Sequence, residues 1–246
     1  MNNPFSLSGK TILVTGASSG IGRGIAIVCA GMGAQVILTA RNTERLQEIL
    51  SALEGKGHSY IAADLTDATQ RTALVEQLPA LHGVVHCAGV GSRVPCKMLT
   101  QEDLDYVMKP NAEAPMLLQA ELLSEKKIAK QASVVFVASA AASMPSAGNA
   151  VYSASKAALV AYAKCLAQEL APRQIRVNCI SPTMVWTDLA LVGATAEQLK
   201  EAEQLYPLKR YGQPEDIANL AIYLLSDASA WMTGSNIEIT GGSQIL

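Results

Sequence analysis

Short runs of apolar, often β-branched residues alternate with longer segments of helical periodicity along almost the whole chain. Continuous apolar runs are typical of strands that are buried on both faces of a parallel sheet. Strands that alternate with helices in this way are joined by right-handed crossovers. The pattern therefore predicts an α/β fold, a Rossmann-type doubly wound parallel sheet of about seven strands with helices on both faces. The expected strands span residues 11–14, 35–39, 59–62, 84–87, 133–137, 175–180 and 236–239, and the expected helices span residues 21–32, 45–53, 68–78, 101–123, 152–170, 196–203 and 215–224.

The length of 246 residues fits one large domain, and 50% of the residues are hydrophobic, as a largely buried sheet requires. No repeat, linker or low-complexity stretch marks a second domain, so residues 1–246 are expected to form a single domain. The least regular segment is 183–209, where Gly193 and Pro207 stand among apolar residues. This segment is predicted to be a mobile flap.

Charge and cysteine content exclude several classes of function. The net charge of −2, without a basic run, argues against a nucleic-acid partner. The five cysteines are scattered without C-x-x-C spacing, so we expect neither a disulfide framework nor a metal site, and a cytoplasmic location fits. The N-terminus lacks the features of a signal peptide, and no apolar stretch is long enough for a membrane span.

A glycine-rich loop, TGASSGIG, joins the first expected strand to the first expected helix. Glycines permit a tight turn and let a phosphate approach the backbone N–H groups of a helix N-terminus. A purely structural turn would use the same glycines. The position at a strand-to-helix junction favours dinucleotide binding, through Gly16, Ser18, Ser19, Gly20, Ile21 and Gly22.

The end of the second expected strand indicates which dinucleotide is bound. An acidic residue at this place would bind the adenosine ribose of NAD(H). The chain has Arg41 instead, which could pair with the ribose phosphate of NADP(H). NADP(H) is therefore the preferred cofactor and NAD(H) remains possible, with Arg41 as a solvated surface charge in the second case.

Tyr152 and Lys156 are separated by one helical turn, so both side chains lie on one face of the expected helix. An ammonium beside a phenol stabilises the phenolate and makes the phenol a proton donor for a carbonyl oxygen. Ser139, at the end of the fifth expected strand, could give a second hydroxyl to the same oxygen. Most Tyr/Lys pairs at this spacing are ordinary helix surface, so the pair alone does not establish a site.

These motifs together resemble the short-chain dehydrogenase/reductases, from about Lys10 to the Gly241-Gly242 pair. The compact members that include the β-ketoacyl-acyl-carrier-protein reductases are the most similar subgroup. The resemblance implies that Ser139 orients a substrate carbonyl, Tyr152 is the acid-base group, and Lys156 supports the tyrosine and binds the nicotinamide ribose. It also implies that Asn111 follows a kink at Pro110 and connects to the lysine through water. The remaining cofactor contacts implied by the resemblance are Asp64, Leu65, Cys87, Ala88, Gly89, Pro182, Val185 and Thr187.

Two positions depart from the family pattern. The usual N-N-A-G after the fourth strand is His86-Cys87-Ala88-Gly89, and the usual Pro-Gly after the sixth strand is Pro182-Thr183. We expect His86 to be structural and Cys87 to be a small buried residue rather than a nucleophile. The stiffer, β-branched Thr183 affects the expected path of the flap.

The resulting hypothesis is that the chain is an NADPH-dependent oxidoreductase that reduces a ketone or aldehyde to an alcohol. A 3-oxoacyl thioester is one possible substrate. The alternative is a non-catalytic dinucleotide sensor or structural protein of the same fold. Met144, Trp186 and Leu189 are candidate substrate contacts, although they could equally be core or subunit contacts. A basic landing patch for an acyl carrier protein could come from Lys126, Lys127, Lys130 and Arg173. By resemblance, the chain assembles as a homotetramer or homodimer.

Overall fold

A parallel sheet in the order β3-β2-β1-β4-β5-β6-β7 forms the centre of the computed structural model, which describes residues 3–191 and 195–243. The first crossovers run from β1 outward to β3, and the later ones return to β4 and continue to β7. The order reverses between β1 and β4, which makes these two strands the switch point of a doubly wound fold. The predicted fold class is confirmed.

The predicted elements are all present, with changed ends. The strands are β1 (Thr11–Thr15), β2 (Gln35–Ala40), β3 (Ser59–Ala62), β4 (Leu81–His86), β5 (Ile128–Val137), β6 (Arg176–Pro182) and β7 (Asn236–Ile239). The helices are α1 (Gly20–Gly31), α2 (Thr43–Ala52), α3 (Ala68–Gln77), α4 (Gln101–Met108), α5 (Ala114–Ser124), α6 (Ala150–Leu170), α7 (Ala196–Glu203) and α8 (Pro214–Leu225).

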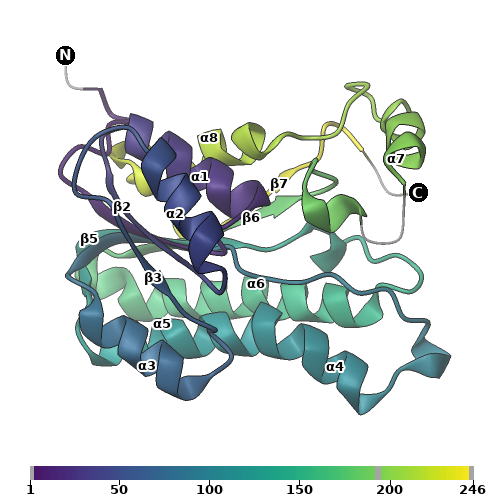
Figure 1. The fold of residues 1–246 in the computed structure, drawn as a ribbon, viewed down its shortest axis with the longest axis horizontal. Coiled ribbons are helices and arrows are strands. Elements are labelled where there is room, and N and C mark those ends of the chain that lie inside the picture. The colour runs from purple at the N-terminus through teal and green to yellow at the C-terminus, as the bar shows by residue number, and fades with distance from the viewer. Residues whose placement is uncertain (1–2, 192–194, 244–246) are drawn as a thin grey trace.

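The helices form one layer on each face of the sheet (Figure 1). Because side chains alternate along a strand, Ile12 and Val14 of β1 pack under α1, α2 and α8, whereas Leu13 packs under α3, α5 and α6. All three side chains are fully buried. Two hydrophobic layers therefore fix the sheet from both sides. In the described part of the chain, no helix is both long and apolar enough to cross a membrane.

The helix predicted over residues 101–123 is interrupted. A capping box of Thr100 and Asp103 begins α4, and a π-helical turn at Lys109–Glu113 separates it from α5. Pro110 lies in this turn, and a proline has no N–H to continue the regular hydrogen-bond ladder. The wider turn places Asn111 on the buried side, fully covered. Where the sequence predicted a kink at Pro110, the structure has a π-helical turn.

Candidate active site

At the switch point, where β1 and β4 pair in parallel, one hydroxyl group also joins the end of β1 to the loop after β4. Thr15 Oγ1 accepts hydrogen bonds from the N–H groups of Cys87 at 2.9 Å and Ala88 at 3.1 Å. Gly16 follows directly with φ +63°, and a Cβ atom there would lie 2.8 Å from the backbone N and Cα of Ala88. Only a glycine, which has no Cβ atom, can bring its backbone this close to the backbone of Ala88. The loop after β1 and the loop after β4 therefore form one continuous floor. Thr15 was not among the predicted site residues, although it is the first residue of the glycine motif.

The glycine loop leads into the N-terminus of α1, where the first N–H groups have no partner within the helix. A side chain on Gly22 would overlap the carbonyl oxygen of Gly16, and one on Gly20 would lie 3.0 Å from the Thr187 methyl group. The loop borders a cavity of about 840 Å³. Ligand pockets commonly measure roughly 300–1,000 Å³. The backbone cradle and the size of the cavity fit a dinucleotide with its phosphates at α1.

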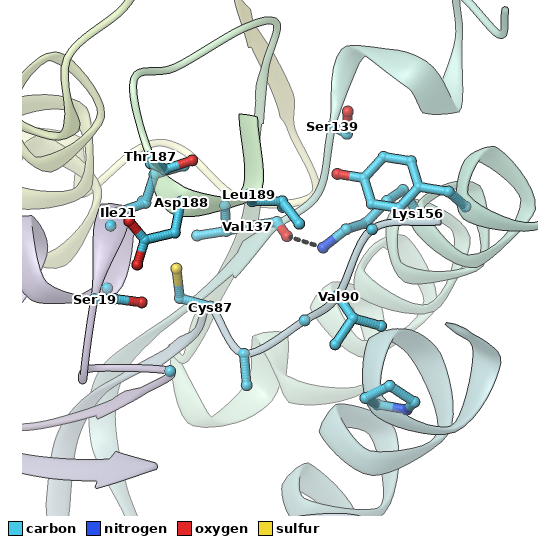
Figure 2. A pocket seen from close by; sticks show the side chains of 18 of the residues that line it. Ser19, Ile21, Cys87, Val90, Val137, Ser139, Lys156, Thr187, Asp188 and Leu189 are labelled. Carbon is cyan, nitrogen blue, oxygen red and sulfur yellow. Dashed lines mark hydrogen bonds between the residues drawn. The ribbon is translucent and has the colours of Figure 1, made fainter. Parts of the chain in front are cut away.

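Tyr152, Lys156 and Ser139 line the same cavity. Lys156 is 5% exposed, and its Nζ donates to the carbonyl oxygen of Val137 at 2.9 Å, which is the dashed line in Figure 2. The same Nζ lies 5.8 Å from the centre of the Tyr152 ring. Ser139 follows β5, and its Oγ accepts from the N–H of Ala141 at 3.1 Å. The structure thus brings three of the four predicted catalytic side chains to one cavity.

Asn111, the fourth of these residues, does not line the cavity. Its Oδ1 accepts from the N–H of Val90 at 2.7 Å, and its Nδ2 donates to the carbonyl oxygen of Val90 at 2.9 Å and to Ser155 Oγ at 3.2 Å. A Cβ atom on Gly89 would lie 3.0 Å from Asn111 Oδ1 and 3.5 Å from Lys156 Nζ. Asn111 therefore fixes the loop after β4 next to the lysine. The predicted connection of Asn111 to Lys156 through a water molecule stays a prediction.

The end of the cavity beside β2 and β3, where the sequence predicted the adenine to bind, carries charged side chains. Arg41, Asp64 and Leu65, three of the predicted cofactor contacts, line this end together with Arg45 and Asp188. Burial alone would raise the pKa of the Asp64 carboxyl, but hydrogen bonds from the hydroxyl and N–H of Thr66, with the charge of Arg41, hold that pKa below its ordinary value. Asp64 is therefore ionised at neutral pH and able to accept hydrogen bonds.

The flap segment borders the other side of the cavity. Pro182, Val185, Thr187 and Leu189 line the cavity, and Met144 does so from the loop after β5. Figure 2 shows Thr187, Asp188 and Leu189 of this segment among the side chains that line the cavity. Residues 192–194 of the predicted flap lie outside the described residues.

Trp186, a predicted substrate contact, does not line the cavity. Its Nε1 donates to Glu203 Oε2 at 2.9 Å, and its ring packs on Tyr211 with 5.6 Å between centroids. Successive residues of an extended segment point in opposite directions, so Val185 and Thr187 face the cavity while Trp186 faces α7. No pattern in the sequence indicated the direction of the Trp186 side chain.

The two residues that depart from the family pattern have different surroundings. Cys87 is half-buried in the cavity wall, and burial raises the pKa of its thiol to about 12, although the Lys156 ammonium acts in the opposite direction. The thiol is protonated at neutral pH and is a poor nucleophile. His86 is buried against the Phe136 ring at 4.5 Å, and its Nε2 pairs with Gln119 Oε1 at 3.0 Å. Both observations agree with the interpretation made from the sequence.

We expect the buried imidazole to make the folded protein sensitive to mild acid. Burial lowers the pKa of His86 to about 4, although the bond to Gln119 acts in the opposite direction. Above about pH 6.5 the ring is neutral in both the folded and the unfolded chain, so it has no effect on stability. As the pH falls from about 6.5 towards 4, only the unfolded chain takes up the proton, and the free energy of unfolding decreases. The loss should be about 2 kcal/mol by pH ~5.

Urea unfolding of the wild type and of His86→Asn at about pH 7.5 and about pH 5 would measure this effect. The other two histidines are common to both proteins, so the difference between the two pH dependences isolates His86. Equal pH dependences would show that His86 is protonated in the folded protein as readily as in the unfolded chain.

Comparison with known proteins decides the family. A family model described as Enoyl-(Acyl carrier protein) reductase matches residues 16–244. A short-chain type dehydrogenase/reductase from Mycobacterium marinum has a solved structure that superposes with a TM-score of 0.89 at 32% identity, covering 99% of this chain and 98% of that one. The chain belongs to the short-chain dehydrogenase/reductase family.

Two further relatives show the range of this family. The 3-oxoacyl-[acyl-carrier-protein] reductase FabG of Rickettsia felis is 32% identical over 97% of this chain and 98% of its own length. A candidate NAD(P)-dependent gluconate 5-dehydrogenase of Beutenbergia cavernae, solved with NADP at low occupancy, is 32% identical with a TM-score of 0.88 and covers 98% of both chains. This short-chain dehydrogenase/reductase is therefore an oxidoreductase of a family that uses NAD(P) and acts on carbonyl or alcohol groups.

Proposed function

We propose that the chain is an NADPH-dependent reductase that converts a ketone or aldehyde into an alcohol. The observation that carries this proposal is the convergence of Tyr152, Lys156 and Ser139 on the cavity bordered by the glycine loop. A dinucleotide sensor would need the loop but would have no use for these three side chains in the same cavity. Tyr152, Ser139, Lys156 and Asn111 are the proposed catalytic set.

Each side chain has a distinct part in the proposed mechanism. When bound, a reduced nicotinamide cofactor supplies the hydride for the carbonyl carbon. Tyr152 donates its phenolic proton to the carbonyl oxygen, while the Ser139 hydroxyl donates a hydrogen bond to the same oxygen and stabilises the developing negative charge. The Lys156 ammonium stabilises the phenolate that remains. Asn111 holds the loop after β4 in place and, through water, connects the lysine to bulk solvent.

We further propose that NADP(H) is preferred, because Arg41 lines the adenine end of the cavity. Replacement of Arg41 by glutamine should weaken NADPH binding about ten- to a hundredfold, the usual effect of losing a charge-assisted hydrogen bond. NADH binding should stay within about twofold, because NADH has no ribose phosphate. Titration followed by the fluorescence of the reduced nicotinamide measures both affinities.

Arg23→Gln is the matched control for this substitution, because Arg23 is exposed on α1 and lies outside the cavity. It should bind both cofactors as the wild type does. If Arg41→Gln weakens NADPH and NADH equally, Arg41 does not recognise the phosphate and the preference is not based on this residue.

The remaining features of the proposal concern the whole protein. We propose one catalytic domain in which residues 183–209 act as the substrate flap, a cytoplasmic location and a homotetrameric or homodimeric assembly. Exposed apolar side chains such as Tyr106, Leu117 and Trp231 favour association with further copies. Multi-angle light scattering tests the assembly.

A 3-oxoacyl thioester is a second candidate substrate, favoured by the likeness to FabG. The predicted landing patch does not adjoin the cavity of the same chain, because residues 126–130 precede or begin β5 whereas the cavity lies at its carboxyl end. Lys127 donates to the carbonyl oxygens of Glu76 and Leu78, and Arg173 to that of Ile128. Two of the four cations of the predicted patch are therefore already hydrogen-bonded to backbone carbonyl oxygens.

Oxidation of NADPH against a panel of ketones, aldehydes, sugars and 3-oxoacyl thioesters tests the proposed function. We expect loss of the absorbance of NADPH with at least one class of carbonyl compound. Tight NADPH binding without turnover of any compound, under conditions in which FabG is active on its own substrate, would favour the sensor.

A further inference from the structure

The cavity has a second end, across the switch point from Arg41. The loop after β4 leads there: Gly89 lies beside Lys156, and a Cβ atom on Gly91 would lie 2.9 Å from Leu189 of the flap. The N–H of Val94 donates to the carbonyl oxygen of Gly148 at 2.8 Å, just before α6. Residues 92–93 therefore lie between the flap and the loop that precedes α6. Arg41 follows β2, on the other side of β1 and β4, so this end is the one left for a substrate.

The substrate end is rich in polar side chains without partners. Ser92, Ser146, Asn149 and Tyr206 all line the cavity there. In residues 3–191 and 195–243, none of these four side chains forms a hydrogen bond with another protein group. Hydroxyl and amide groups that line a cavity without internal partners are available to a ligand with hydroxyl groups of its own.

Arg93 adds a positive charge to this end of the cavity. Among the described residues, no carboxylate lies within 4.0 Å of Arg93. Lys109, a second cation of the cavity lining that directly follows α4, is different because it pairs with Asp105 at 2.8 Å. Within the described part of the chain, Arg93 is therefore an exposed guanidinium without a carboxylate partner, and its planar fork suits a carboxylate.

We propose, on the basis of the carbonyl reduction proposed above, that the substrate is a short hydroxylated oxo acid whose carboxylate is bound by Arg93. Hydride adds to the carbonyl carbon and the Tyr152 proton adds to its oxygen, so the C=O group becomes CH–OH and NADPH becomes NADP⁺. The carboxylate takes no part in the bond changes. Ser92, Ser146, Asn149 and Tyr206 bind the hydroxyl groups along the chain of the substrate.

A long acyl chain suits this end of the cavity less well. A bound acyl chain would cover these hydroxyl, amide and guanidinium groups, which water reaches in the free protein, without giving them hydrogen-bond partners, and that is costly. Met144 and Leu189 are two of the apolar side chains that line the cavity, and they suit the carbon backbone of a small substrate.

The experiment compares two molecules that differ in one group. Sorbose is a ketose, and the oxogluconate with its carbonyl next to the terminal hydroxymethyl group has a carboxylate in place of the other hydroxymethyl group. Each is titrated calorimetrically into the full chain saturated with NADP⁺, and each is assayed for NADPH oxidation. The variants are Arg93→Gln, Arg93→Lys and, as the control, Lys97→Gln, which removes an exposed cation of the same loop outside the cavity.

We expect the wild type and Lys97→Gln to bind and reduce the acid in preference to sorbose. Arg93→Gln should weaken acid binding and raise its KM about tenfold or more, with kcat nearly unchanged and sorbose unaffected. Arg93→Lys should restore part of the affinity. Equal binding of the acid by Arg93→Gln and Lys97→Gln, or no preference of the wild type for the acid, would overturn the assignment. Binding of the acid without NADPH oxidation would instead contradict the proposed reductase.

Discussion

Replacement of Tyr152 by phenylalanine is expected to lower kcat for carbonyl reduction by about 10²–10⁴-fold, the usual contribution of a general acid. The ring would still fill its place at the start of α6, so packing should be preserved. Only the proton for the carbonyl oxygen would be lost, together with one hydrogen bond to the developing charge. NADPH affinity should change by less than about threefold, since Lys156 and the glycine loop remain. Steady-state kinetics and nicotinamide fluorescence measure the two quantities.

Tyr162 provides a matched control on the same helix. Its hydroxyl donates to the carbonyl oxygen of Met116 at 3.4 Å, its ring meets Phe136 edge-on, and it does not line the cavity. Tyr162→Phe should reduce carbonyls at close to the wild-type rate. If both variants lost activity equally, the loss would come from disturbance of α6. If Tyr152→Phe kept near wild-type kcat, Tyr152 would not be the proton donor.

Replacement of Gly16 by alanine should have the second largest effect. The new Cβ atom would lie 2.8 Å from the backbone of Ala88 at a φ of +63°, so the loops after β1 and β4 would have to separate. Overpacking of this kind usually costs about 1–3 kcal/mol, in addition to about 1–2 kcal/mol for the left-handed backbone. A shift of about 1 Å in the floor of the cavity should lower kcat/KM about a hundredfold. Urea unfolding and NADPH-dependent kinetics measure both effects.

Gly9→Ala separates the backbone cost from the contact with Ala88. Gly9 has φ +78°, and a Cβ atom there would have no neighbour within 4 Å. This variant should lose about 1–2 kcal/mol of stability and keep its activity. Should Gly16→Ala resemble Gly9→Ala in both measurements, the floor of the cavity would be more adaptable than the contact with Ala88 implies.

The sequence predicted the order and type of the elements because the strands of the sheet centre are continuously apolar. The short length of these runs and their β-branched residues favour strands over buried helix segments. The interruption of the helix at Lys109–Glu113 was foreseen only as a kink at Pro110, since a sequence pattern of period 3.6 does not distinguish a π turn from an α turn.

The candidate site was predictable where a backbone motif or a fixed spacing specifies it, as for Gly16 or the pair of Tyr152 and Lys156. It was not predictable where the direction of a side chain decides the outcome. Trp186 and Thr187 are neighbours in sequence, yet Thr187 lines the cavity and Trp186 does not. Arg93 carries no motif either, and it becomes a candidate only when the loop after β4 is seen to pass between the flap and α6.

The hydrogen bonds from Cys87 and Ala88 to Thr15 join residues 72 and 73 positions apart in the chain. Closure of so long a loop is slow compared with local helix formation, so we expect the floor of the cavity to form after the local helices. A partly folded chain would offer the glycine turn without its other half and would have little affinity for a dinucleotide. The cofactor should then act as a folding ligand, stabilising the native state by about 2.7 kcal/mol at a hundred times its Kd.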